Sequence, residues 1–467
     1  MPPGHSVVRG SAAQNSRDKT LLKEIARSPH QKIKVAVTDI DGILRGKYLH
    51  KDKFLAAAEA GFGFCNVVFG WDSADVCYDN GRYTGWHTGY PDAQVRIDPA
   101  TRREIPWDQE IPFFLGDFVD AEERPLDVCP RQLLKRVLDR ARQAGYAARC
   151  GVEFEWFNFK ETPQSLAAKG YVDPQPLTPG MFGYSILRSS LNQPYFAALM
   201  DQLRDFGIPL EGLHTETGPG VTEAAIAYTD ALEAADRAVL FKTAVKEIAY
   251  RHGILASFMA KWNAALPGSG GHFHLSLWDA AGEKSRLFDA RDERKMSPTF
   301  RSFLAGQLRC LPEILPFFAP TVNSYKRLVD GYWSPTKSTW GVDNRTTAFR
   351  VIPGGPKSTR VEVRIAGADM NPYLAIAAAV ASGLYGIEKG LELSDAPVVG
   401  SAYAESSIPR LPRTLSEATD QLENSKIARE LFGDAFVDHF VRTRRWEWAQ
   451  FRDAVTAWEL KRYFEII

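Results

Sequence analysis

Three short strand-like segments of this chain carry polar or ionisable side chains at every second residue. The segments are VEFEWF, GGHFHLSLW and TRVEVRI. Because side chains alternate between the two faces of a strand, each polar set projects to one side and the apolar residues between them project to the other. The polar sets are Glu153 and Glu155, then His272, His274 and Ser276, then Arg360, Glu362 and Arg364. A face of carboxylates, imidazoles and guanidiniums packs poorly but suits divalent metal ions and phosphate.

The pair Glu153 and Glu155 has an ordinary alternative, a solvated strand face. The flanking residues Phe154, Trp156 and Phe157 argue against it, since so aromatic a strand is expected to be covered on both sides. Buried carboxylates without a partner are costly, and a bound cation removes that cost. The segment therefore favours a cation site over a solvated face.

Two further glutamates, Glu216 and Glu223, lie in HTETGPGVTEAA, where Gly218, Pro219 and Gly220 predict an irregular loop. Taken alone, Glu223 is also explained as an acidic residue at the start of the next element. Together with the strand carboxylates the set has four glutamates. Hard oxygen ligands with one or two imidazoles favour Mg²⁺ or Mn²⁺ over zinc.

The HxH of His272 and His274 is a weak signal by itself, because a lone buried histidine is commoner than a metal ligand. Some barrel hydrolases begin their zinc site with HxH, but they need further histidines downstream. Only His439 follows His274 in this chain. The zinc-hydrolase interpretation is therefore disfavoured.

A cationic run surrounds Gly354-Gly355-Pro356. Each of its members has the alternative of a structural surface role; they are Lys326, Arg327, Arg345, Arg350, Lys357, Arg360 and Arg364. Because Arg360 and Arg364 flank Glu362 on one strand face, part of this charge must meet the carboxylate site. Guanidiniums beside magnesium indicate phosphoryl transfer, in which the protein positions the phosphates and neutralises their charge. The sequence has no GxxxxGK[ST], so a P-loop does not hold the nucleotide.

The elements that position these groups alternate loosely between strands and helices, which predicts an α+β fold. Strand signals in KVAVTDI, FCNVVF, AQVRI and PFFLGDFVD, with a turn at DGILRGK, predict a small β domain. Apolar spacing predicts helices over RQLLKRVLDRARQAG, ending at Gly145, and over DALEAADRAVLFKTAVKEIAYRHG, ending at Gly253. A strand is expected in ILASFMAKW. We expect a mobile tail over 1–30 with a short helix at LLKEIA, a small domain over 31–125 and a catalytic domain over 126–467.

Composition narrows the class of protein. The 467 residues carry 57 basic and 57 acidic side chains, so nothing indicates a nucleic-acid partner. Five scattered cysteines without a CxxC suit a reducing compartment. No apolar run approaches the ~20 residues of a membrane span, and the first thirty residues lack the apolar segment of a signal peptide. A cytoplasmic protein is expected, with no membrane partner.

The ordered motifs of this chain resemble those of the glutamine synthetase family. They are GVEFEW, HTETGPGVTE, PGSGGHFHLSLW, APTVNSYKRLVDGYWSP, DNRTTAFRVI, RVEVRI and MNPYLAIAAAVASGL, and the likeness runs from about Ile33 to the C-terminus. The resemblance is to the class I-like enzymes. It implies a β-grasp domain followed by a catalytic α+β domain with a curved antiparallel sheet. It also implies active sites between neighbouring subunits of a ring-shaped homo-oligomer, with rings stacked in a dodecamer-like assembly.

The resemblance further implies a role for each residue that matches a motif. It assigns Glu155, Glu216 and Glu223 to a first divalent metal ion, and Glu153, His272 and Glu362 to a second. It assigns His274, Ser276, Lys357 and Arg360 to ATP, and Arg345 and Arg350 to the transferring phosphoryl group. It assigns Gly268, Arg327 and Arg364 to the acidic substrate, the two arginines as carboxylate clamps. The cofactors implied are Mg²⁺ or Mn²⁺, two or more per site, with ATP as co-substrate.

The chain departs from the family where ammonia is handled. Glutamine synthetases have GYE after SYKRLV, and this glutamate helps to deprotonate ammonium, whereas here the residues are Gly331, Tyr332 and Trp333. Trp333 cannot accept a proton but can cover a larger, partly apolar amine. Pro267 replaces the family's asparagine, which leaves the identity of the acidic substrate open. Asp72, Ser73 and Asp75 of the small domain do not align with the family's ammonium site, and LPRTLSEA has no tyrosine at the usual adenylylation position.

These departures favour the γ-glutamyl-amine ligase branch, in which glutamate is joined to a primary amine other than ammonia for amine catabolism or nitrogen assimilation. Trp333 favours a monoamine over a polyamine as the acceptor. One alternative is a glutamine synthetase with a relocated base. A second is a non-catalytic ring-forming relative, which is expected to have lost metal or ATP residues, whereas all six expected metal ligands are present.

Overall fold

The small domain is built on a five-stranded sheet in the computed structural model, which describes residues 12–467 and side chains from residue 19. Its strands are β1 (Lys32–Thr38), β2 (Leu44–His50), β3 (Phe62–Cys65), β4 (Asp92–Ile105) and β5 (Ile111–Val119), in the order β2-β1-β5-β4-β3. The inner strands β1 and β5 are parallel and the other neighbours antiparallel. Helix α2 (Lys51–Ala60) packs across this sheet. The expected β-grasp arrangement is confirmed.

Strand β5 is buried at every position because both of its faces are covered. Phe114 and Phe118 project into the core of the small domain. Phe113 and Leu115, on the other face, join the larger core of the catalytic domain. The uninterrupted apolar run PFFLGDFV thus reflects a strand between two cores.

Two details of the small domain differ from expectation. FCNVVF is not one strand: β3 ends at Cys65 and a 3-10 helix, η1 (Asn66–Phe69), follows. Val68 and Phe69 are consecutive and both buried, which a helical turn permits and a strand with one covered face does not. The DGILRGK segment is a turn only up to Ile43, and its remainder begins β2.

The short helix expected at LLKEIA is part of a longer one, α1 (Ala12–Arg27). Ile25 of α1 is buried in the core of the small domain, which anchors this part of the expected tail. Residues 1–11 of that tail lie outside the described residues.

The catalytic domain has a nine-stranded sheet centred on β6 (Tyr146–Phe159). The path is β12-β13-β14-β11-β6-β8-β7, and β9 and β10 also pair with β6; only β12 and β13 run parallel. The bounds are β7 (Leu210–Thr215), β8 (Val221–Ile226), β9 (Thr229–Asp230), β10 (Leu255–Ser257), β11 (Gly271–Asp279), β12 (Trp340–Val342), β13 (Phe349–Ile352) and β14 (Arg360–Val363). The strand expected over ILASFMAKW is reduced to the three residues of β10.

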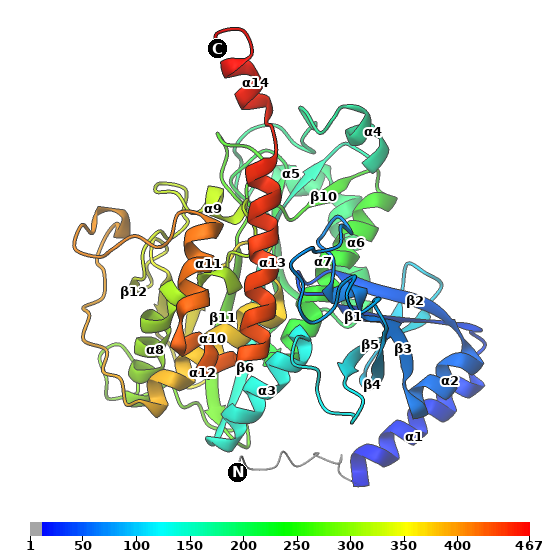
Figure 1. Ribbon diagram of the computed structural model, residues 1–467. Helices are drawn as coiled ribbons and strands as arrows, with labels where there is room; N and C mark the ends of the chain where they lie inside the picture. The colour runs from blue at the N-terminus through cyan, green and yellow to red at the C-terminus, as the bar shows by residue number, and fades with distance from the viewer. Residues whose placement is uncertain (1–11) are drawn as a thin grey trace.

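Helices cover the back of this sheet. The inner layer is α3 (Pro130–Gln143), α7 (Ala231–Arg251) and α10 (Pro372–Glu388); α3 and α7 pack on β6, and α10 packs on both of these helices. Outside them lie α8 (Pro298–Ile314), α11 (Leu415–Asn424), α12 (Lys426–Phe432) and α13 (Asp434–Asp453) (Figure 1). The remaining helices are α4 (Pro163–Ala168), α5 (Ile186–Leu191), α6 (Gln193–Asp205), α9 (Ser324–Arg327), η2 (Leu315–Phe317), η3 (Ala402–Ala404) and α14 (Ala457–Tyr463). None of the helices within residues 12–467 is long and apolar enough to span a membrane.

A buried ionic network joins the two domains. Arg131 of α3 donates to Asp98 and Asp117 of the small domain at 2.9 and 2.7 Å, and to Asp236 of α7 at 2.8 Å. The Arg131 side chain is 3% exposed, so these contacts lie in a medium where an unpaired charge is costly. The network fixes the small domain beside the sheet that carries the site.

Candidate active site

Strand register brings the chemistry-bearing residues together. His272 of β11 lies directly opposite Glu153 of β6, and Glu155 lies opposite Glu223 of β8. Glu362 of β14 lies opposite His274 on one side and Arg350 on the other. Directly opposed residues project to the same face of a sheet, so five strands contribute to one polar surface. The alternation in the sequence predicted the faces correctly.

Two adjoining cavities open on this surface. The larger cavity, of about 610 Å³, is lined by the residues that are expected to hold the metal ions, the phosphoryl group and the acidic substrate. These are Glu153, Glu155, Glu216, Glu223, His272, Glu362, Arg345, Arg350, Gly268, Arg327 and Arg364, together with Trp333. The smaller, of about 270 Å³, contains all four residues expected to contact ATP: His274, Ser276, Lys357 and Arg360. Glu153 lines both cavities.

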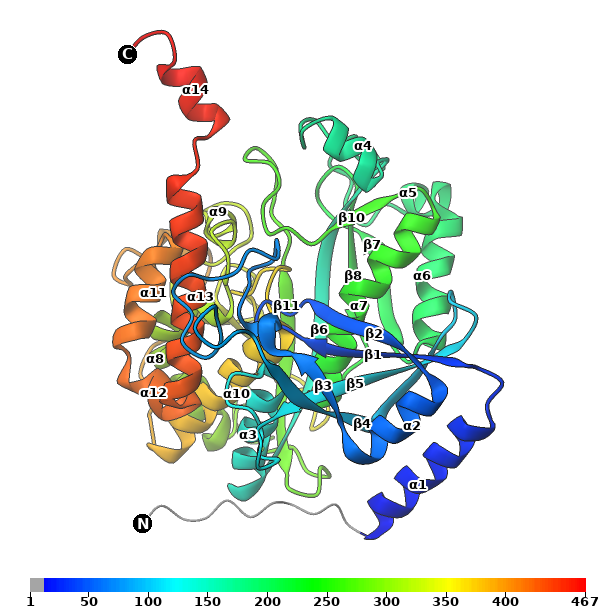
Figure 2. The ribbon, with the colours of Figure 1, turned by 45° about the vertical axis from the view of Figure 1, so that its right-hand side comes forward.

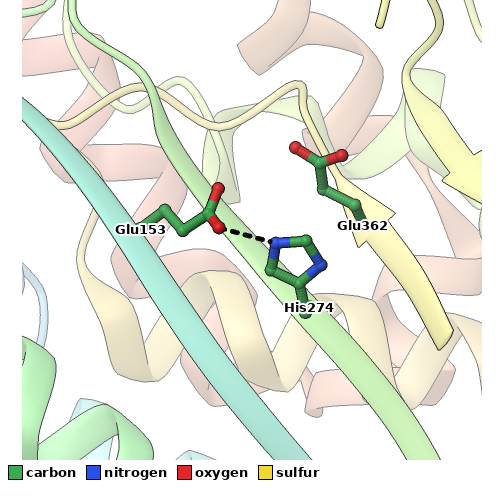
Figure 3. A group of neighbouring side chains, drawn as sticks. All are labelled: Glu153, His274 and Glu362. Carbon is green, nitrogen blue, oxygen red and sulfur yellow. Dashed lines mark ion pairs between the residues drawn. The ribbon is translucent and has the colours of Figure 1, made fainter. Parts of the chain in front are cut away.

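Carboxylate and imidazole groups form three triplets whose ligand atoms lie within 4.8 Å of one another. Figure 3 shows one of them, with His274 between Glu153 and Glu362 and its Nε2 3.1 Å from Glu153 Oε1. The triplets found within the described residues are Glu153–His274–Glu362, Glu153–Glu223–His272 and His214–Glu216–Glu223. Residues from both expected metal sets occur in them. Glu155 is in none of the triplets, although it lines the same cavity.

The electrostatics of the cluster fit a cation. Burial, and then the neighbouring Glu155 and Glu153, raise the pKa of Glu223 to about 9. Burial also raises the pKa of Glu155, although Gly270 N–H donates to Glu155 Oε2 at 2.5 Å. Burial and Arg364 lower the pKa of His272, which keeps the imidazole neutral and able to coordinate. Carboxylates that repel one another around a neutral imidazole are a suitable donor set for a divalent metal ion.

Glu362 is held differently from the other carboxylates. Burial alone would raise its pKa, but the guanidiniums of Arg364 and Arg350 lower it to about 2. Arg364 Nη1 donates to Glu362 Oε1 at 2.6 Å, and Arg350 Nη1 donates to Oε2 at 2.9 Å. Glu362 is therefore ionised and oriented by two guanidiniums, one from Arg350 on β13 and one from Arg364 directly after β14.

The two expected carboxylate clamps are buried and partly engaged by the protein. Arg327 donates to the carbonyl oxygens of Ile365 at 3.0 Å and Arg364 at 3.3 Å. Arg364 also donates through Nε to the Arg345 carbonyl at 3.0 Å. Gly268 sits where a Cβ would lie 2.5 Å from the Ala260 carbonyl oxygen and 2.8 Å from Arg327 Cγ. Glycine at position 268 therefore lets this loop approach Arg327 closely.

The cationic groups differ in how freely they can meet a phosphate. Arg345 and Lys357 are exposed. Arg360 lines the smaller cavity, but its Nε donates to His274 Nδ1 at 3.1 Å and its Nη1 donates to the Ser358 carbonyl at 2.9 Å. Arg350 is bound by Glu362 and by Asp343.

His214 and Tyr184 also line the larger cavity, although neither was predicted as a site residue from the sequence. His214 lies on β7, with Nε2 3.5 Å from Glu223 Oε2 and Nδ1 3.8 Å from Glu216 Oε2. Tyr184 stacks on its ring, with centroids 4.5 Å apart. The spacing of His214 and Glu216, two residues apart in HTE, is the same alternation seen in the other strands and was a usable signal. Nothing in the local sequence marks Tyr184.

Comparisons with known proteins agree with this geometry. Residues 127–463 match the family model described as glutamine synthetase, catalytic domain. The chain is 53% identical over 461 residues to type-1 glutamine synthetase 2 of Dictyostelium discoideum, covering 98% of this chain and 88% of the relative. It is 39% identical over 440 residues to the glutamate–isopropylamine ligase of a Pseudomonas species, covering 93% and 95%. A solved structure described as a GmaS/ADP complex superposes with a TM-score of 0.83 at 30% identity, covering 95% and 99%.

The chain therefore belongs to the glutamine synthetase family of ATP-dependent ligases. Enzymes of this family use ATP and divalent metal ions, and the carboxylate and histidine groups described above could hold such ions. The relatives include both a glutamine synthetase and a ligase of a larger amine, so membership alone does not define the nitrogen-containing substrate.

Proposed function

We propose that this enzyme phosphorylates the γ-carboxylate of glutamate with ATP and then forms an amide with a primary amine other than ammonia. The observation that carries the proposal is the residue at position 333. Trp333 lines the larger cavity beside Arg345 and Arg364, at the position where glutamine synthetases carry a glutamate. It is 60% exposed, so its indole is available to a substrate.

The carboxylate nearest to Trp333 in the chain does not replace the missing base. Asp330 accepts hydrogen bonds from Thr336 Oγ1 at 2.7 Å and from Arg410 Nη1 at 2.6 Å. Burial acts to raise the pKa of Asp330, but the hydrogen bonds from Thr336 and Arg410 and the charge of Arg410 lower it. An ionised carboxylate held in this way is a weak proton acceptor. We call residues 328–334, which carry Asp330 and Trp333, the acceptor loop.

The side chains of the two cavities have different roles in the first step, the transfer of the phosphoryl group from ATP to glutamate. His274, Ser276, Lys357 and Arg360 line the smaller cavity and are suited to ATP, as expected from the sequence. Arg345 and Arg350 line the larger cavity, where they can neutralise a phosphoryl group in transfer. When bound by the glutamates and His272, Mg²⁺ or Mn²⁺ would supply neutralisation of phosphate charge.

The acidic substrate is proposed to bind at Arg327, Arg364 and Gly268 of the larger cavity. Its γ-carboxylate oxygen attacks the γ-phosphorus of ATP, which forms an acyl phosphate and releases ADP. The amine nitrogen then attacks the acyl carbon, phosphate leaves, and the nitrogen loses a proton. Trp333 covers the carbon substituent of the amine and excludes water from this second step.

Glutamine synthesis from ammonia is the second candidate. The relative that is 53% identical carries the name glutamine synthetase. Glu216 and His214 of the same cavity could accept the proton of ammonium in place of the missing glutamate. The two candidates differ in which acceptor releases phosphate fastest.

We also propose that the protein assembles with copies of itself into a ring-shaped homo-oligomer of stacked rings. The support within this chain is the C-terminal segment, which extends away from the body in both views (Figures 1 and 2). Its large apolar side chains are exposed: Trp458, Leu460, Tyr463, Phe464, Ile466 and Ile467. An exposed apolar segment of this kind is typical of a subunit contact.

The proposed function is tested by phosphate release from Mg-ATP and glutamate with alternative acceptors. We expect kcat/KM for a small alkylamine, such as isopropylamine or ethylamine, to exceed that for ammonia by more than tenfold. Ammonia as the best acceptor would replace the proposal with glutamine synthesis.

A further inference from the structure

The acceptor loop holds Trp333 in a backbone conformation that neighbouring contacts must stabilise. The φ angle is +85° at Gly331 and +60° at Trp333. Glycine adopts positive φ freely, whereas a residue with a Cβ is strained there. Strain of this kind persists only where surrounding structure fixes it, and it is common at ligand sites. The contacts of the residues around Trp333 therefore decide where its indole lies.

Tyr332, the residue before Trp333, contacts a buried ammonium group. Lys261 Nζ lies 4.1 Å from the centroid of the Tyr332 ring. Lys261 is 6% exposed, and its Nζ also donates to the Leu266 carbonyl. A cation removed from water is attracted to an aromatic face more strongly than an exposed one.

Lys261 is itself fixed in place by a side chain from another segment. Its backbone N–H donates to Asn323 Oδ1 at 2.8 Å, and Asn323 Nδ2 donates to the Lys261 carbonyl at 2.8 Å. From Lys261 the chain runs through Leu266 to Pro267 and Gly268, which line the larger cavity. The ammonium group is thus a fixed point that is linked, through the Leu266 carbonyl, to the segment carrying Pro267 and Gly268.

Other contacts hold the two ends of the acceptor loop. Asp330 is bound by Thr336 and Arg410, and the side chains of Asp330 and Arg410 are 40% and 42% exposed. At the other end, Arg364 Nη2 lies 3.5 Å from the Trp333 carbonyl, the outer limit of a hydrogen bond. Between these ends, the ring of Tyr332 rests on Lys261.

We propose that Lys261 is a specificity-determining positioning residue, which through the Tyr332 ring fixes Trp333 at the wall of the acceptor site. Lys261 is not among the residues that line either cavity, so it acts through Tyr332 and not on a substrate. The proposal deepens the proposed function and rests on it, since it concerns the acceptor. It also links Pro267 and Trp333, two of the departures from the family, because Lys261 contacts both of the segments that carry them.

Four single variants and one double variant test the contact kinetically. Lys261→Met removes the charge at similar length, and Tyr332→Leu removes the ring; each is expected to raise KM for the best acceptor about tenfold. KM for ATP is expected to stay within twofold, because the smaller cavity has no contact with Lys261 among the described residues. Lys261→Arg and Tyr332→Phe keep a cation and a ring and are expected to stay close to wild type. The double variant Lys261→Met/Tyr332→Leu should be no worse than either single one.

Hydrogen–deuterium exchange supplies a readout that does not depend on activity. In Lys261→Met, a peptide covering residues 328–334 is expected to exchange about tenfold faster than in the wild type, while peptides from β6 and β11 stay unchanged. Lys389→Met is the matched control, since Lys389 faces the ring of Tyr385 at 5.4 Å on α10, away from both cavities. It should leave both the acceptor KM and the exchange of the acceptor loop unchanged.

The outcomes separate this inference from the proposed function. Unchanged exchange of the acceptor loop in Lys261→Met, or equal rises in KM for acceptor and ATP, would overturn the positioning role whichever acceptor the wild type prefers. Ammonia as the best wild-type acceptor would overturn the proposed function alone. In that case, faster exchange and a raised KM for ammonia in Lys261→Met would still support the positioning of the loop.

Discussion

Replacing Trp333 by glutamate or glutamine separates two roles of position 333, the apolar wall and the missing base. The two replacements are nearly identical in shape and share any strain from the positive φ at this position. They differ only in whether the loop carries a carboxylate. Comparing them with the wild type therefore isolates the effect of removing the indole from the effect of adding a base.

The expected magnitude follows from the area that the indole can cover. A three-carbon substituent that loses half of its water contact against one aromatic face gains roughly half of ~0.8 kcal/mol per carbon, or about 1.2 kcal/mol. That free energy corresponds to a factor of about eight in kcat/KM. We expect Trp333→Gln to lower kcat/KM for isopropylamine about eightfold and to leave that for ammonia within about twofold.

Trp333→Glu should lose the same apolar contact and gain a proton acceptor. A positioned general base contributes typically about 10²–10⁴, and an unoptimised one is expected to raise kcat/KM for ammonia by about tenfold over Trp333→Gln. The assay is phosphate release from Mg-ATP and glutamate, with each acceptor varied below its KM. An isopropylamine-to-ammonia ratio that is equal in the wild type and both variants would refute the role of the acceptor loop in choosing the acceptor.

Three further predictions concern the metal cluster and the domain interface. Glu155→Ala and Glu362→Ala should each abolish phosphate release, because each removes a cavity carboxylate; turnover retained in both would contradict the two-metal assignment. Folded Glu223 keeps its proton to about pH 9, whereas the unfolded chain loses it near 4.5. The stability that Glu223 contributes to the metal-free protein should therefore be fully present below that lower value and be lost as pH rises towards 9, and thermal unfolding in chelator should show a flatter pH dependence between these two values for Glu223→Gln. Arg131→Met should lower the free energy of unfolding by about 3–5 kcal/mol, whereas Arg291→Met, at an exposed ion pair, should change it by less than ~1 kcal/mol; equal effects would contradict the interdomain role.

Alternation along single strands was enough to predict which side chains share the site face. Glu153, His272 and Glu362 sit on that face because strand side chains alternate, a local property that needs no knowledge of the fold. Which strands are neighbours is a long-range property. The pairing of Glu155 with Glu223, and of Arg350 with Glu362, comes from the sheet order and could not be derived from spacing within one segment.

The strand propensity of FCNVVF gave a wrong prediction, because two consecutive residues of this segment are both buried. Val68 and Phe69 looked like strand residues, yet the small-domain core accepts both only from a helical turn. The contacts of Asp72 could not be predicted from the sequence either. The structure shows its Oδ1 accepting from Ala74 N and Val76 N and its Oδ2 accepting from Trp446 Nε1 at 2.9 Å. Trp446 lies on α13, far from Asp72 in the sequence. Only the fold therefore shows that the Asp72 carboxylate already has hydrogen-bond partners within the protein.

The central claim is that the acceptor is a primary amine larger than ammonia. The most direct test is the wild-type enzyme with Mg-ATP and glutamate against ammonia, methylamine, ethylamine, isopropylamine, ethanolamine, putrescine, spermidine and aniline, with phosphate release and amide product both measured. We predict that a monoamine with a short carbon substituent gives the highest kcat/KM, more than tenfold above ammonia. Ammonia giving the highest value would contradict the account and leave Trp333 without a role in catalysis.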